Sequence, residues 1–116
     1  MAALAFVASI LPGKQEAWRR FYQALEGSRR HQYEEFHERL GITKEEVWLT
    51  QTPQGEMAIV YLEADSAERM IPDLAASRLP FDFWFKGQLL ELYGLDVQKQ
   101  QAKQLNELVF VWSTPS

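Results

Sequence analysis

Two hydrophobic patterns at the start of the chain predict a buried strand followed by two helices. Residues 3–11 form an apolar run of strand length that ends at Pro12–Gly13. Over residues 14–40 the apolar side chains recur every three or four positions, which is the spacing of an amphipathic helix. Gly27 interrupts this spacing, and because glycine destabilises a helix interior by ~1 kcal/mol, we expect two helices with a bend there. The second helix should end at Gly41, since glycine is favoured just past a helix C-terminus.

The next pattern predicts a β-hairpin. Residues 46–52 alternate in the manner of a strand and are rich in β-forming side chains. Residues 57–64 form a second apolar run of strand length. The connection between them contains Pro53 and Gly55, which both favour turns. Two such runs joined by a short glycine-containing loop are typical of a hairpin.

The rest of the chain predicts two shorter helices and a last strand. Asp65 and Glu68 have the spacing of a capping box at the start of the first of these helices. The second helix should cover residues 81–93 and end at Gly94. After a polar loop, residues 105–113 (LNELVFVWS) carry alternating large apolar side chains, and we expect a strand that is covered on both faces.

The predicted order is therefore strand, helix, strand, strand, helix, strand, with the helix doubled in each crossover. This is the β-α-β-β-α-β order of ferredoxin-like folds. A length of 116 residues is typical of one domain. We expect a single α+β domain over residues 1–116, with a four-stranded antiparallel sheet that carries its helices on one face and dimerises through the other.

Four segments resemble a small uncharacterised family within the dimeric α+β barrel superfamily. They are residues 18–64, 80–85 (PFDFWF), 89–96 (LLELYGLD) and 107–113 (ELVFVWS). In that superfamily, ferredoxin-like protomers pair their sheets face to face, so the resemblance implies a homodimer of the dimeric α/β-barrel type. Its members include cofactor-free monooxygenases, haem-degrading enzymes, isomerases and stress-responsive proteins of unknown function, and a shared fold does not choose among them.

Composition and charge narrow the function classes. The chain has 12 Lys and Arg against 16 Asp and Glu, and this acidic balance argues against a nucleic-acid-binding protein, which usually presents a basic face. The absence of cysteine excludes disulfides, thiolate metal sites and cysteine nucleophiles, and it fits a cytoplasmic protein. The apolar N-terminus has no preceding Lys or Arg and is too short to cross a bilayer, so we expect a first strand, not a signal peptide, and no membrane association.

Aromatic residues supply the candidate ligand contacts. Trp48 and Tyr61 lie on predicted strands, and Trp84 and Phe85 lie on the predicted helix of residues 81–93. Side chains of this kind line apolar ligand pockets, and these four are our ligand-binding candidates. Large aromatic side chains also fill cores and dimer interfaces, so a structural role is the alternative for each of them.

Polar candidates for catalysis are few. Histidine titrates near neutral pH, so His31 suits acid–base chemistry, and Tyr33 and Asn106 are further polar groups that a cavity could hold. Glu34 and His37 have a Glu-x-x-His spacing, which places two potential metal ligands on one helix face. Di-iron proteins need two such motifs and more glutamates. We therefore expect neither a metal nor a cofactor.

Three functions stay open from the sequence. The first is a homodimeric domain that binds a small apolar or aromatic molecule. The second is an enzyme of the cofactor-free monooxygenase or isomerase kind. The third is a structural or interaction module without a ligand.

Overall fold

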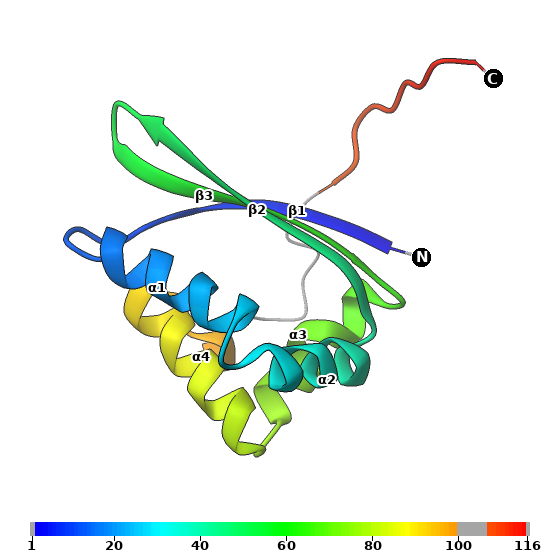
Figure 1. Ribbon diagram of the computed structural model, residues 1–116. Helices are drawn as coiled ribbons and strands as arrows, with labels where there is room; N and C mark the ends of the chain where they lie inside the picture. Colours follow the sequence, from blue (N-terminus) through cyan, green and yellow to red (C-terminus); the bar gives the residue numbers. More distant parts are fainter. Residues whose placement is uncertain (1, 100–106, 116) are drawn as a thin grey trace.

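The computed structural model describes residues 2–99 and 107–115, and it places four helices against one face of a three-stranded sheet (Figure 1). The elements follow one another as β1 (Ala2–Ser9), α1 (Gln15–Glu26), α2 (Arg30–Leu40), β2 (Ile42–Thr52), β3 (Gly55–Ala64), α3 (Ala67–Ala76), α4 (Pro80–Tyr93) and the short 3₁₀ helix η1 (Val97–Lys99).

The sheet is antiparallel, with β3 at its centre between β1 and β2. β2 and β3 form the predicted hairpin, and β2 begins earlier than the sequence pattern indicates. A β-bulge interrupts the start of β2. Ile42 pairs with Ala64, and Lys44 pairs with the adjacent residue of β3, Glu63. Thr43 between them is therefore the extra residue of the bulge.

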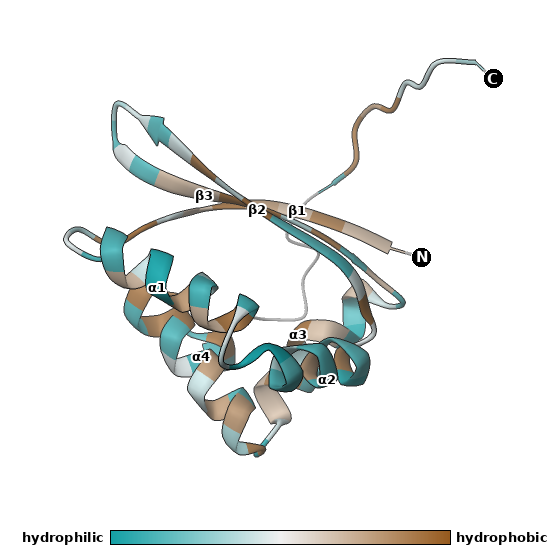
Figure 2. Cartoon of the chain, viewed as in Figure 1, coloured by the Kyte–Doolittle hydropathy of each residue, from teal (hydrophilic) through white to brown (hydrophobic). Residues whose placement is uncertain are grey.

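The helix-facing side of the sheet forms one wall of the hydrophobic core. Leu4, Val60 and Leu62 are buried on it. The helices supply most of the remaining core residues: Trp18, Phe21, Leu25, Phe36, Leu40, Met70, Leu74, Phe81, Phe85 and Leu92. Figure 2 shows hydrophilic residues along the outer surfaces of α1 and α2, which is the expected colouring of helices that bury only one face.

Aromatic side chains of α4 fill much of this core. The ring of Phe85 lies 4.7 Å from that of Phe36 and 5.5 Å from that of Phe21, measured between centroids. Phe81 contacts Phe36 edge to face at 5.3 Å. Phe83 is exposed. Most of the aromatic surface of this helix therefore serves packing against α1 and α2.

The predicted β-α-β-β-α-β order and four-stranded sheet are wrong. The chain has the order β-α-α-β-β-α-α with a three-stranded sheet, and residues 107–115 form no strand. The apolar residues 108–112 are at least 71% exposed. The alternating pattern of residues 105–113 satisfies strand propensity, but a strand also needs a partner for its backbone groups, and residues 107–113 have none in the described chain. Residues 105 and 106 of that prediction lie outside the described residues.

Glycine marks the ends of α1 and α2 as predicted. α1 ends just before Gly27, and α2 ends just before Gly41, which has a φ of 71°. A Cβ atom at Gly41 would lie 3.1 Å from Oδ2 of Asp65, so both the backbone conformation and the space favour glycine there. The predicted capping box of Asp65 and Glu68 is wrong. Ser66 is the N-cap residue of α3, and the backbone N–H of Asp65 donates to the carbonyl of Gly41 at 2.8 Å.

An ion pair between the buried carboxylate of Asp82 and the partly exposed side chain of Arg39 joins α2 to the first turn of α4. Arg39 donates through both Nη atoms to the carboxylate of Asp82, at 2.8 and 2.9 Å, and Oγ of Ser77 donates to it at 2.5 Å. Lys86 Nζ donates to the carbonyl of Ser77 at 3.0 Å and is also buried. Burial raises the pKa of Asp82, but the hydrogen bonds from Arg39 and Ser77 and the charge of Arg39 together lower it below its ordinary value.

Replacing Asp82 by asparagine should destabilise the fold by about 2 kcal/mol, because this fully buried side chain loses its charge-assisted hydrogen bonds with Arg39. Since the folded-state pKa of Asp82 is lowered, its stabilisation is present above roughly pH 4 and is lost as the pH falls through the lowered value. Urea unfolding of the wild type and the variant between pH 7 and pH 2 measures this difference, which should shrink in acid.

The control is Asp73→Asn. Asp73 lies 4.0 Å from Arg69 at the surface, and exposed pairs of this kind contribute less than about 1 kcal/mol. Equal unfolding midpoints for the two variants at neutral pH would contradict the prediction.

Candidate functional site

A cavity of ≈ 90 Å³ lies between the sheet and the helices. All three strands, all four helices and η1 contribute residues to its wall. The wall is apolar, with residues such as Phe36, Leu62 and Met70, except that Glu45, Tyr22 and Tyr93 are also among its lining residues. The cavity therefore has three residues with polar side-chain groups in apolar surroundings.

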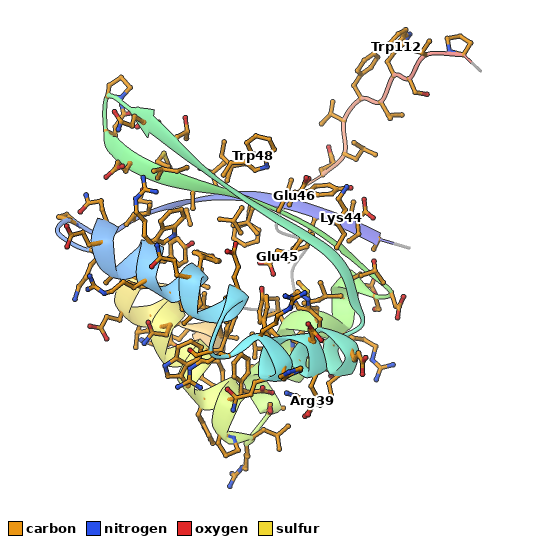
Figure 3. The ribbon with its side chains drawn as sticks, in the orientation of Figure 1. Arg39, Lys44, Glu45, Glu46, Trp48 and Trp112 are labelled. Atoms are coloured by element: carbon orange, nitrogen blue, oxygen red, sulfur yellow. The ribbon has the colours of Figure 1, made fainter. Side chains whose placement is uncertain are left out.

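Glu45 reaches the cavity because of the register of β2. Ile42 and Glu45 both line the cavity although they are three positions apart, and successive residues of a regular strand face opposite ways. The extra residue at Thr43 accounts for this. Figure 3 shows Glu45 on the helix side of the sheet and Trp48 on the opposite side.

Two side chains of α2 hold the Glu45 carboxylate. The hydroxyl of Tyr33 donates to its Oε1 atom, and Nε2 of His37 lies 3.1 Å from the same oxygen. The side chain of Glu45 is only 15% exposed. Burial, followed by the charge of Glu45, raises the pKa of Tyr33, so this phenol is neutral and donates a hydrogen bond at physiological pH.

Tyr22 and Tyr93 form a second polar cluster on the wall. Their hydroxyl oxygens lie 2.9 Å apart, and Nε1 of Trp18 donates to the Tyr93 hydroxyl at 2.6 Å. Burial is the main cause that raises the pKa of both phenols. The hydrogen bonds from Tyr22 and Trp18 lower the pKa of Tyr93 in part, and the carboxylate of Glu45 raises the pKa of both tyrosines further.

These groups define what the cavity can do chemically. Neutral phenols donate hydrogen bonds, and a carboxylate accepts hydrogen bonds or a proton. An apolar wall with a few such groups binds a small molecule and orients its polar end.

The structure separates the four aromatic residues that the sequence nominates for ligand binding. Phe85 lines the cavity. Trp48 is 60% exposed on the far face of the sheet, where Tyr61 also lies, since it alternates along β3 with the buried residues of that strand. Trp84 is half-buried on α4, and the guanidinium of Arg29 stacks 3.9 Å from the centre of its ring.

The three residues nominated for catalysis also differ in their surroundings. Tyr33 donates a hydrogen bond to Glu45 but is not among the residues that line the cavity. His31 is exposed on α2, whereas the other histidine, His37, contacts Glu45. Asn106 lies outside the described residues.

Sequence reasoning missed the polar groups of this cavity. Glu45 had a usable signal, because it has the same strand alternation as Val47 and Leu49, which face the helices. Tyr22 and Tyr93 had none, since their spacing is that of ordinary core residues on amphipathic helices.

Within residues 2–99 and 107–115, no three His, Asp or Glu side chains come together in a group that could hold a metal ion. No helix among these residues is long and apolar enough to span a bilayer.

Comparison with known proteins identifies no relative. No family model matches the sequence, and no curated protein or solved structure is significantly similar to it. The resemblance to the dimeric α+β barrel superfamily therefore stays a prediction, and the case for a function rests on the cavity and the surfaces of this chain.

Alkaline titration should show that the buried phenols ionise only when the protein unfolds. The pKa values of Tyr22, Tyr33 and Tyr93 are raised in the folded state. The stabilisation from the neutral phenols is therefore fully present below roughly pH 10, the pKa of tyrosine in the unfolded chain. Above that pH, each buried phenol lowers the free energy of unfolding by about 1.4 kcal/mol per pH unit until its folded-state pKa is reached. Near-ultraviolet tyrosinate absorbance and far-ultraviolet circular dichroism should change together in one cooperative step. Titration of three phenols with an unchanged dichroism signal would contradict this.

Proposed function

We propose that this protein binds a small, mainly apolar molecule in the cavity between its sheet and its helices. The observation that carries the proposal is the presence of Glu45 and neutral phenols in an otherwise apolar wall. A carboxylate in such a place costs free energy that an apolar side chain would not. Ligand sites are typically apolar cavities in which a few polar groups fix the orientation of the ligand.

The size of the cavity limits the ligand. The volume of the cavity is ≈ 90 Å³. A cavity of about 150 Å³ in another protein binds benzene. The ligand that fits without rearrangement is therefore smaller than benzene.

Xenon should bind the apolar part of this cavity and shift the methyl NMR signals of the residues that line it, because xenon binds in apolar cavities. Leu89→Phe should abolish these shifts, since Leu89 lines the cavity and the added atoms fill it from α4. The matched control is Leu90→Phe, because the adjacent Leu90 is 51% exposed and the same atoms are added outside.

Circular dichroism and thermal unfolding establish that both variants are folded, and overpacking at residue 89 should cost about 1–3 kcal/mol. The proposal fails if xenon shifts no methyl signal in the wild type, or if it shifts the signals equally in the two variants.

A second candidate function is self-association through the outer face of the sheet. Val7, Ile59 and Trp48 form a row across the three strands of this face and are 56%, 37% and 60% exposed. The segment of residues 107–115 carries a further apolar surface. Exposed apolar patches of this kind are typical of protein contacts.

We propose that a second copy of this chain covers these surfaces. The sheet face and the 107–115 segment are both exposed, and the segment, with Trp112 on it, extends away from its own sheet (Figures 1 and 3). Reciprocal contact between two copies covers the segment of each copy with the sheet of the other. A homodimer thus accounts for both surfaces at once.

Sedimentation should show a dimer that Trp48→Glu and Phe110→Glu each dissociate, because each substitution places a charge in an apolar contact. Gln51→Glu should leave the dimer intact, since Gln51 is exposed on the same strand outside the apolar row. A monomeric wild type would overturn the proposal, as would a dimer that survives either of the first two substitutions.

A further inference from the structure

The phenol cluster on the cavity wall has one hydrogen more than its contacts use. Trp18, Tyr22 and Tyr93 together carry three polar hydrogens, namely one N–H and two O–H. Two hydrogen bonds join them, from Trp18 to Tyr93 and between the two phenols. Whichever phenol donates to the other, one O–H hydrogen is left over, and both phenols line the cavity.

Glu45 has a carboxylate oxygen available as a hydrogen-bond acceptor on the same cavity wall. Its Oε1 atom takes both the hydrogen bond from Tyr33 and the contact with His37. In the described part of the chain no side chain donates to its Oε2 atom at hydrogen-bond distance. Glu45, Tyr22 and Tyr93 all line this one small cavity, so the spare acceptor and the spare donor lie on the same wall.

We propose that the cavity selects small molecules that carry a hydroxyl group, such as short branched alcohols. This inference rests on the proposed function, because it names the class of molecule bound at the same site. A hydroxyl is both a donor and an acceptor, so its oxygen accepts the spare phenol hydrogen while its own hydrogen is donated to Oε2 of Glu45. The alkyl part occupies the apolar remainder of the cavity.

Other classes of small molecule satisfy the spare phenol hydrogen and the Glu45 oxygen less well. A ketone accepts from the phenol but leaves the Glu45 oxygen without a donor, and a hydrocarbon satisfies neither group. A carboxylic acid in its ionised form brings a second negative charge to Glu45. Hydrogen bonds to a charged group are the stronger kind, so the hydroxyl should be favoured over a ketone of the same shape by about tenfold or more in affinity.

Propan-2-ol and acetone provide a matched pair of probes, because they have the same carbon skeleton, are smaller than benzene and both dissolve in water. Titration of the full chain, followed by methyl NMR shifts of the lining residues, should give a dissociation constant about tenfold lower for the alcohol. In Glu45→Gln the alcohol should bind about tenfold more weakly, with the ketone unchanged within about twofold.

Glu46→Gln is the control, since it makes the same chemical change at the neighbouring, exposed residue on the outer face of the sheet. It should retain the preference for the alcohol. Equal affinities for alcohol and ketone in the wild type would overturn this inference even if Glu45→Gln does not fold. Loss of the preference in both variants would overturn it as well.

Xenon binding distinguishes a failure of the hydroxyl inference from a failure of the proposed cavity function. Xenon binding without a preference for the alcohol rejects the hydroxyl inference and leaves the proposed cavity function standing. Absence of binding by xenon, alcohol and ketone alike rejects both.

Discussion

The register of the β2–β3 hairpin determines which side chains enter the space between the sheet and the helices. The extra residue at Thr43 allows both Ile42 and Glu45 to line the cavity. Because a shift of one residue exchanges the two faces of a strand, a hairpin without this bulge could not place both of them on the helix side. The extra residue brings Ile42 to the helix side, while Glu45 faces the helices through the alternation that it shares with Val47 and Leu49.

Asp82 is buried and Glu45 is largely so, and the surroundings of these two carboxylates differ in a way that separates structure from function. Both oxygens of Asp82 accept hydrogen bonds, two from Arg39 and one from Ser77. The protein itself supplies donors to both oxygens of this carboxylate, which fixes α4 against α2. Glu45 uses one oxygen for its contacts with α2. A carboxylate with a remaining acceptor in an apolar cavity has the capacity to bind something else, and this difference is the reason that we place a ligand beside Glu45.

Local signals predicted much of the fold and little of the site. The ends of α1 and α2 followed from Gly27 and Gly41, because glycine acts on the backbone at its own position. The hairpin followed from its alternation and its turn residues. The polar network could not be predicted in the same way, since Tyr22 of α1 and Tyr93 of α4 are far apart in the sequence and meet only through the packing of the two helices.

The segment of residues 107–115 marks the limit of such reasoning. Its alternating apolar side chains indicate an extended segment with two faces to bury. From the sequence alone we expect the segment to be the fourth strand of the sheet of the same chain, which would bury both faces. Periodicity carries no information on which backbone pairs with a strand or which surface covers it, because both are decided by tertiary and quaternary contacts. In this structure the segment and the outer face of the sheet stay exposed together. The alternation that led to the wrong fold prediction therefore supports the proposed association between copies. It indicates apolar side chains that need to be buried, and the described residues of the same chain do not bury them.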